Sequence, residues 1–173
     1  MIVFQDEASL SNTASVSHKW SLKGKQPAVA QKQRKRERKT LFGCVEPKTE
    51  IVITDVADRG NTVTFFKFLV KVAKLYPEQK VVMVVDNVRY HHAKRLKPVL
   101  EKYKKRIELV YLPAYSPDLN PIERIWWYMR KKISHNRYLE KMEDRLTKFN
   151  ELMNTFKCEN QLGKNLSNLI VNI

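Results

Sequence analysis

The chain has 173 residues, 43% of them hydrophobic and 10% aromatic, which suits one globular domain with a small appendage and is too short for two large domains. Its 33 Lys and Arg against 18 Asp and Glu give a formal charge of +15, so nucleic acid is the expected partner. No apolar run approaches the ~20 residues of a membrane-spanning helix, the start lacks the features of a signal peptide, and the two distant cysteines indicate neither a disulfide framework nor a CxxC zinc site.

The first third of the chain predicts short strands. The segment MIVFQDE predicts a strand that ends at or near Asp6, and a second strand is expected around Trp20. The segments TLFGCVE, residues 40–46, and EIVITDV, residues 50–56, predict two more strands. Their close spacing and short turns indicate an antiparallel meander.

From residue 61 onward the pattern alternates between helices and strands. Apolar periodicity predicts helices over residues 61–77, 96–103, 121–133 and about 139–156. Short apolar runs predict strands at 81–85 and 107–113, and the first of these, VVMVV, is typical of a central strand covered on both faces. Strands followed by alternating helices and strands indicate an α/β protein with a sheet of mixed direction.

Three acids lie at or near the ends of predicted elements, where they could meet at one edge of the sheet. Asp86 directly follows the run 81–85, and the functional crevice of an open α/β sheet lies at the carboxyl ends of its parallel strands. Asp6 follows the first strand, and Glu123 lies one turn into the helix after the last strand. Converging carboxylates repel each other unless a cation is present, and Mg²⁺ prefers such oxygen ligands. Two such ions could clamp a phosphodiester, the group that a basic protein would bind.

Two of these acids also have purely structural interpretations. Asp86 beside Asn87 suits an Asx turn that closes a strand. Glu123 lies three residues after Asn120, which is the expected N-cap of the helix, so it suits a capping box.

The remaining polar candidates have alternatives as well. Alternation along a strand lets only one of Asp6 and Glu7 face the site. Asp118 is an alternative third acid, although SPD also suits an ordinary turn. His91 and His92 could position a phosphate or water, or could serve as surface or packing residues. From the residues alone, a metal-dependent nuclease is one plausible interpretation.

The basic and aromatic residues leave two further choices open. The run QKQRKRERK, residues 31–39, suits either a solvated loop or an arm that follows DNA phosphates. As an arm it would bind DNA through Lys32, Arg34, Lys35, Arg36, Arg38 and Lys39. Of the adjacent tryptophans, we expect one in the core and one at the surface, with base stacking by Trp127 as the less common role.

Three blocks, FQDE, VVDNVRYHHA and LPAYSPDLNPIERIWWYMRKKI, together resemble the catalytic domain of mariner-superfamily DDE transposases, in particular their bacterial insertion-sequence branch. The block LPAYSPDLNPIE.IW is the most specific, because so many fixed turn and helix-start residues rarely coincide. The resemblance covers about residues 2–133, including the order of the elements. It implies an RNase H-like fold, which is an α/β architecture with a mixed five-stranded sheet flanked by helices.

The resemblance also implies the chemistry. Asp6, Asp86 and Glu123 would be the catalytic and metal-binding triad, because the last acid of the family is the glutamate that follows NPI. Family members use Mg²⁺, for which Mn²⁺ is the expected substitute, to cleave DNA at the ends of their element and to join the freed 3′ hydroxyl to a target. Asn87 and His91 match the DN...H pattern and would position the ligands or the DNA.

Domain limits and partners are further expectations. Residues 1–135 would form the catalytic domain and residues 136–173 a C-terminal helical extension, in which 158–173 have no assigned role. The protein would act on DNA as a homodimer in the bacterial cytoplasm, at the nucleoid, with segment 9–38 near DNA or a partner subunit. Relatives carry helix-turn-helix modules before the first acid, whereas five residues precede Asp6 here, so a separately encoded helix-turn-helix half is expected.

Three hypotheses result. The leading one is a Mg²⁺-dependent enzyme that cuts and joins DNA. The second is a non-catalytic DNA-binding or oligomerisation remnant of a split transposase. The third is a general RNase H-like nuclease, from which the SPDLNPIE block separates the first.

Overall fold

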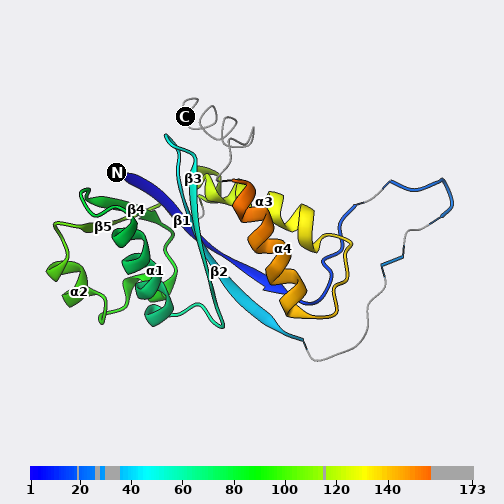
Figure 1. Cartoon of the computed structure of the whole chain (residues 1–173), viewed down its shortest axis with the longest axis horizontal. Helices are drawn as coiled ribbons and strands as arrows, with labels where there is room; N and C mark the ends of the chain where they lie inside the picture. The colour runs from blue at the N-terminus through cyan, green and yellow to red at the C-terminus, as the bar shows by residue number, and fades with distance from the viewer. Residues whose placement is uncertain (19, 26–27, 30–35, 115, 157–173) are drawn as a thin grey trace.

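Five strands form one mixed sheet (Figure 1). The computed structural model describes residues 1–18, 20–25, 28–29, 36–114 and 116–156. Its strands are β1 (Ile2–Ser11), β2 (Arg38–Glu46), β3 (Ile51–Ala57), β4 (Val81–Val85) and β5 (Ile107–Tyr111). They lie in the order β3-β2-β1-β4-β5. Strands β1, β2 and β3 are antiparallel neighbours, whereas β4 is parallel to both β1 and β5. The predicted mixed five-stranded sheet is confirmed.

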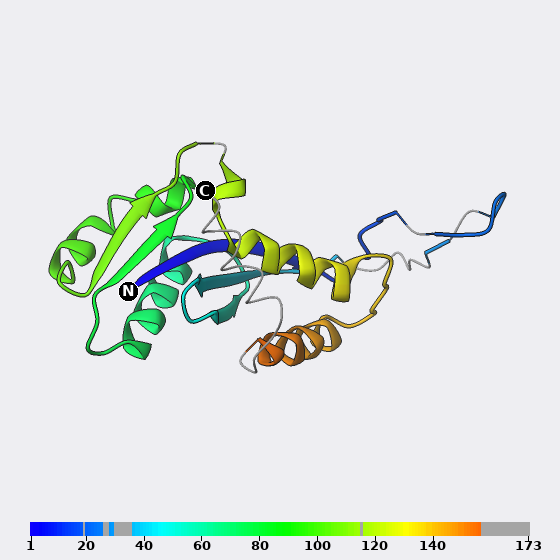
Figure 2. The same ribbon diagram turned by 90° about the horizontal axis from the view of Figure 1, so that it is seen from above.

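Helices cover both faces of the sheet (Figures 1 and 2). Helix α1 (Thr62–Leu75) buries its apolar stripe against one face, in a core that includes residues of all five strands. Helices α3 (Ile122–Met129) and α4 (Met142–Thr155) share a second core with β1, β2 and β3 on the other face. The short segments between them are η1 (Arg89–His92), α2 (Lys97–Lys102), η2 (Pro117–Leu119) and the π-helical turn η3 (Arg130–Ser134).

Two expectations about the first part of the chain are wrong. Strand β1 continues past Asp6 to Ser11, because β2 supplies an antiparallel partner along this whole stretch. The described residues 20–25 form no strand, and the side chain of Trp20 is 99% exposed. The described residues beside Trp20 pair with no neighbouring strand, so nothing there satisfies an extended backbone. The middle of segment 12–37, at the described residues 20–25 and 28–29, instead projects from the body of the molecule (Figures 1 and 2), whereas Asn12 and Ala14 at its base are buried.

A glycine of β2 leaves room for a tryptophan of α3 to lie directly against the sheet. A Cβ atom on Gly43 would come within 2.5 Å of Cζ2 and 2.6 Å of Cη2 of Trp126, which is fully buried. Gly43 is also the β2 partner of Asp6. The missing side chain therefore sets the height of α3 above the strand pair that carries Asp6.

Replacing Gly43 by alanine should destabilise the fold. The new methyl group would overlap the Trp126 ring, and overpacking of this kind costs about 1–3 kcal/mol. Trp126→Phe removes Cζ2 and Cη2 without losing a hydrogen bond, since Nε1 has no partner among the described residues. We expect the double variant Gly43→Ala/Trp126→Phe to unfold at higher denaturant than the additive sum of the single variants predicts. Strict additivity in this double-mutant cycle would show that the two residues do not clash.

A buried arginine fixes α4 to the end of β1. Arg145 is fully buried and donates hydrogen bonds to the backbone carbonyls of Ile133 (3.1 Å), Asn12 (3.3 Å) and Arg137 (2.8 Å). Three carbonyl oxygens thus solvate the guanidinium in place of water. The bonds join three parts of the chain where the projecting segment begins.

The C-terminal part agrees with the sequence pattern as far as it is described. The helix predicted at about 139–156 is present as α4. The division into domains 1–135 and 136–173 stays a prediction, and residues 158–173 lie outside the described residues. In the part of the chain that the structure describes, no helix has the length and apolar character needed to cross a membrane.

Candidate active site

The pairing of β1 with β4 brings Asp6 and Asp86 to the same edge of the sheet. The two strands are parallel, with Phe4 opposite Val84. Continuing this register by two residues places Asp6 level with Asp86, the residue that follows β4. Because side chains alternate along β1, Asp6 lies on the face that carries α3, whereas Glu7 lies on the face that carries α1. The structure therefore brings the first two predicted acids together.

Glu123 comes from α3, whose start is tied to β1 by Asn120. The buried Asn120 donates a hydrogen bond from Nδ2 to the carbonyl oxygen of Gln5 at 3.0 Å. Asn120 was expected to cap α3, and this is wrong, because α3 has no side-chain cap and the Asn120 side chain bonds through Nδ2 to β1 instead. Because a capping box requires a side-chain cap, the capping-box interpretation of Glu123 is wrong as well. Arg130, two turns further along, places Nη2 3.6 Å from Oε2 of Glu123.

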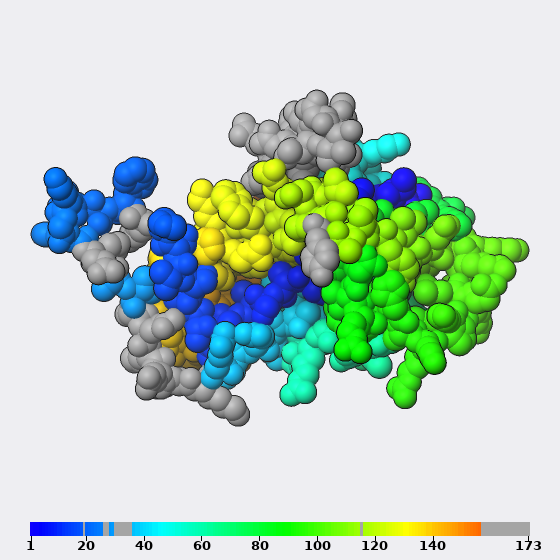
Figure 3. Space-filling model, turned by 180° about the vertical axis from the view of Figure 1, so that it is seen from behind, coloured from blue at the N-terminus to red at the C-terminus, as the bar shows by residue number. Residues whose placement is uncertain are grey.

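All three acids line one cleft with a volume of about 410 Å³. The loops after β4 and β5 and the start of α3 provide its other lining residues, Asn87, Val88, Leu112, Pro113, Ala114, Ser116, Pro117 and Asn120. In Figure 3 the dark blue atoms of β1 lie between the yellow atoms of α3 and the green atoms that follow β4. Asp118 is not among the described lining residues, so Glu123 is the acid that α3 brings to this cleft.

The first two acids have opposite electrostatic surroundings. Burial, followed by repulsion from Glu123, raises the pKa of Asp6 from 3.8 to about 8. For Asp86, burial favours the neutral form, but hydrogen bonds from His91 and from the Val88 N–H outweigh it and lower its pKa. A divalent cation beside these carboxylates would favour the ionised form of Asp6, against the effects of burial and of repulsion from Glu123.

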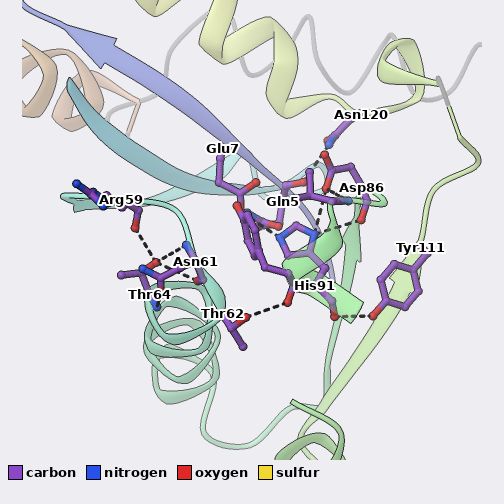
Figure 4. A network of polar contacts seen from close by, with 12 residues as sticks. Gln5, Glu7, Arg59, Asn61, Thr62, Thr64, Asp86, His91, Tyr111 and Asn120 are labelled. Atoms are coloured by element: carbon purple, nitrogen blue, oxygen red, sulfur yellow. Dashed lines mark hydrogen bonds and ion pairs between the residues drawn. The ribbon is translucent and has the colours of Figure 1, made fainter. Parts of the chain in front are cut away.

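His91 connects Asp86 to Glu7 (Figure 4). Its Nδ1 lies 3.0 Å from Oδ1 of Asp86, and its Nε2 lies 3.1 Å from Oε1 of Glu7. The ring is buried and packs on Phe65, with ring centroids 4.1 Å apart. Glu7 also accepts a hydrogen bond from Nε2 of Gln5 at 2.9 Å. This chain of contacts fixes the orientation of Asp86 from the side opposite the cleft.

Sequence reasoning missed this role of Glu7. Glu7 was weighed only as a competitor of Asp6, and the alternation that removes it from the cleft also directs it to the opposite face of the sheet. A pair of histidines five and six residues after Asp86 was the available signal for a partner on that face. The predicted positioning residue His91 lies directly behind Asp86.

His91 is expected to be protonated at neutral pH. Burial alone would lower its pKa, but hydrogen bonds to Asp86 and Glu7 outweigh burial and raise it to about 9. In metal-free buffer, the ring nitrogens of His91 should therefore titrate by NMR near pH 9. Glu7→Gln should lower the midpoint, because a neutral amide stabilises the imidazolium less, and Glu151→Gln on the exposed side of α4 should leave it unchanged. A midpoint at or below 6.5 in the wild type would contradict this ion-paired state.

Asn87 ties the loop after β4 to the end of β5. Its Nδ2 donates to the carbonyl oxygen of Leu112, and its Oδ1 lies 3.2 Å from Nε2 of His92. The His92 ring stacks on Tyr111, with centroids 4.2 Å apart. The second predicted positioning residue thus lies in the wall of the cleft, where it braces the loop that carries Asp86.

Two groups of side chains that share Asp86 have metal-binding chemistry. Glu7, Asp86 and His91 each place a ligand atom within 4.8 Å of the others, and among the described residues no other group of three does so. However, both ring nitrogens of His91 already contact carboxylates, so an ion could bind the ring only by displacing one of these contacts. Asp6, Asp86 and Glu123 are more widely spaced but offer only carboxylate oxygens, which suit Mg²⁺.

The basic run predicted to bind DNA is described only in part. Lys32, Arg34 and Lys35 lie outside the described residues. Arg36 and Arg38 are exposed at the start of β2. Lys39 contacts Asp58, with Nζ 2.5 Å from Oδ1, so part of its charge is already offset.

The fold and this acidic cleft at the strand ends define the chain as an RNase H-like α/β protein. A family model described as DDE superfamily endonuclease matches residues 1–145, and the chain belongs to this family. Membership of this family identifies the chain as an endonuclease type of enzyme.

Known proteins agree with this assignment. The chain is 24% identical over 155 residues to the insertion element IS630 uncharacterized 39 kDa protein of Shigella sonnei, which covers 89% of this chain and 45% of that protein. It is 33% identical over 66 residues to the uncharacterized protein y4pE/y4sA of Sinorhizobium fredii, covering 38% of this chain and 45% of that protein. The chain thus spans less than half the length of these relatives.

Solved structures of mariner transposases share the fold. The Mos1 paired-end complex with Mg superposes with a TM-score of 0.72 at 18% identity, covering 99% of this chain and 53% of that chain. The catalytic domain of Mos1 mariner transposase gives a TM-score of 0.60 at 15% identity, covering 99% of this chain and 81% of that chain. The RNase H-like fold and the resemblance to the mariner and insertion-sequence transposases are both confirmed.

Proposed function

We propose that this chain is the catalytic domain of an insertion-sequence transposase, which cleaves DNA at the ends of its element and joins the freed 3′ hydroxyl to target DNA. The observation that carries the proposal is the single cleft lined by Asp6, Asp86 and Glu123 in a chain of an endonuclease family. Asp6 comes from within β1, Asp86 directly follows β4, and Glu123 lies at the start of α3, so the fold itself determines their approach. Both reactions are phosphoryl transfers and can share this site.

The proposed cofactor is Mg²⁺, with Mn²⁺ as a substitute and two ions in the site. Asp6, Asp86 and Glu123 would hold them, since an all-carboxylate donor set fits a hard divalent cation. The raised pKa of Asp6 supports this, because burial and, after it, repulsion from Glu123 disfavour a carboxylate that a bound cation would stabilise. When bound, such ions would activate the attacking oxygen and stabilise the leaving oxygen.

The residues around the cleft would keep this site in one arrangement. His91 orients Asp86, Glu7 holds His91, and Asn87 braces the loop between them. Asn120 holds the start of α3, and therefore Glu123, beside β1. Because these ligands are already held in place, the site does not have to reorganise during the reaction, and this lowers the activation free energy.

DNA is the proposed partner. The excess of 15 positive charges favours a polyanion, and the exposed Arg36 and Arg38 would contact its phosphates. Acting on DNA would place the protein in the bacterial cytoplasm, at the nucleoid. Recognition of the element ends is assigned to a separately encoded helix-turn-helix half. A gel-shift assay tests this assignment, because clear preference of this chain alone for terminal repeats over random duplex would contradict it.

The projecting segment supports a homodimer on DNA. Val16, Trp20 and Leu22 are 85%, 99% and 73% exposed, which is a large apolar surface for a monomer to leave in water. The base of the segment is fixed by Asn136, whose Nδ2 donates to the carbonyl oxygen of Ser17 at 2.9 Å. A second copy of the chain would cover the apolar side chains. Sedimentation velocity with DNA present should show a dimer that Trp20→Ala weakens, and a wild-type monomer would contradict the proposal.

Nicking of supercoiled plasmid tests the proposed enzyme. We expect nicked product with Mg²⁺ or Mn²⁺ and none in EDTA, at a rate that rises with protein concentration. Binding of the plasmid by the protein is measured in parallel, under the same conditions. Wild-type protein that binds the plasmid but never cuts it with either metal would replace this proposal by the non-catalytic remnant.

A further inference from the structure

Helix α3 has one face in the core and one in solvent. The core face consists of Ile122, Ile125, Trp126 and Met129, all fully buried. The solvent face begins with Glu123 at the cleft, continues with Trp127 four residues further along, and extends into the π-helical turn η3 with Arg130 and Lys131, seven and eight residues after Glu123. Glu123 is the one acid on α3. This face therefore leads from the acidic cleft to an aromatic ring and two cations.

Trp127 leaves an unusually large ring in solvent. Its exposed fraction is 52%, whereas the adjacent Trp126 is 0% exposed. An indole carries roughly 150–250 Å² of surface, so a large apolar area stays uncovered. Lys131 places Nζ 4.9 Å from the Trp127 ring centroid, a cation–π contact. A neighbour on the same helix thus holds the ring at the surface.

The two cations beside Trp127 are accessible to a phosphate. Lys131 contacts the indole and forms no ion pair with a carboxylate of the described residues. Arg130 makes one long contact, with Nη2 3.6 Å from Oε2 of Glu123, and both side chains are 39% exposed. A metal ion on Glu123 would compete with Arg130 for that carboxylate. The freed guanidinium could then bind a phosphate with two parallel hydrogen bonds.

The spacing along α3 matches a DNA strand that leaves the cleft. Four residues of helix rise by roughly 6 Å between Glu123 and Trp127. Successive phosphates of one strand are roughly 3.4 Å apart along a duplex. A nucleotide one or two positions from a phosphate held at Glu123 would therefore reach Trp127.

We propose that Trp127, Arg130 and Lys131 form a binding site for one unpaired nucleotide beside the phosphate that is cut. The Trp127 ring stacks on the base, and the two cations bind its flanking phosphates. The inference rests on the proposed function, since it needs the scissile phosphate at Glu123. Bases in a duplex already stack on each other, so the site favours a strand whose base is exposed, and it tolerates any base because each has a flat face.

Binding of labelled DNA in EDTA tests the site without cleavage. The probes are a fully paired duplex and the same duplex with a short single-stranded extension. Fluorescence anisotropy measures the affinity of the protein for each probe. We expect Trp127→Ala to weaken binding of the extended probe roughly tenfold, the scale of one lost base stack, and to leave the paired probe unchanged. Trp127→Phe should retain most of the affinity. The matched control is Tyr103→Ala, which removes another exposed ring beside a lysine, Lys102 at 5.7 Å, on the distant helix α2.

The outcomes separate this inference from the proposed function. Wild-type affinity of Trp127→Ala for the extended probe, or an equal loss on both probes, would overturn the stacking site even if the protein nicks plasmid. A selective loss on the extended probe supports the site even if no metal gives nicking. Thermal melting of each variant shows that the fold is intact, which the exposure of Trp127 favours.

Discussion

Asp86→Asn is expected to lower the rate of plasmid nicking by roughly a thousandfold, because it removes about 4 kcal/mol of charge stabilisation from a phosphoryl-transfer site. The substitution keeps the size of the side chain and one oxygen that the Val88 N–H can contact at 3.2 Å. It removes the negative charge that a cation would need. Glu123→Gln should have a similar effect, since Glu123 lines the same cleft from α3.

Asp118→Asn is the matched control for these variants. Asp118 lies five residues before Glu123, in the turn η2, and does not line the cleft. Its variant should cut at the wild-type rate at equal folded concentration. A loss as deep as that of Glu123→Gln would mean that the third acid has been assigned to the wrong residue.

Asp6→Asn is expected to stabilise the fold at alkaline pH in metal-free buffer. The folded-state pKa of Asp6 is about 8 against 3.8 for the ordinary group, so the folded chain holds a proton that the unfolded chain releases between these values. Stability therefore falls as pH rises through this window, by roughly 1.4 kcal/mol per pH unit at most, and levels off above it. The variant lacks this loss, so the difference in free energy of unfolding should be near zero at pH 4 and largest near pH 8.

Metal and a second aspartate provide the controls. Saturating Mg²⁺ should reduce the advantage of Asp6→Asn, because a bound ion would stabilise the ionised Asp6 carboxylate of the folded wild type. Asp144→Asn, at an exposed position of α4, should show no such pH dependence. Equal pH profiles for the wild type and Asp6→Asn would contradict the buried, repelled carboxylate.

The sheet and the approach of the acids could be predicted because each depends on a local signal. The valine run before Asp86 marks a central strand, and a parallel neighbour then brings the acid of the first strand to the same edge. The stripe of α3 that includes Ile122 and Trp126 is buried as its period predicts, and Trp127 is at the surface.

Features that depend on distant partners could not be predicted. Strand β1 is long because β2 runs beside it, and Asn120 misses its cap because the Gln5 carbonyl is within reach. Glu7 matters through His91, which is 84 residues away in sequence. Gly43 gives no sign in the sequence that Trp126 will lie against it. Each of these contacts joins segments whose proximity only the folded chain defines.

Anomalous diffraction from crystals soaked in MnCl₂ would show directly which carboxylates bind the metal. We expect density for manganese in the cleft, within ligand distance of Asp6, Asp86 and Glu123, and the loss of that density in Glu123→Gln crystals. Manganese between Glu7 and His91 instead, unchanged by Glu123→Gln, would contradict the proposed metal site and place the metal in the other group that shares Asp86.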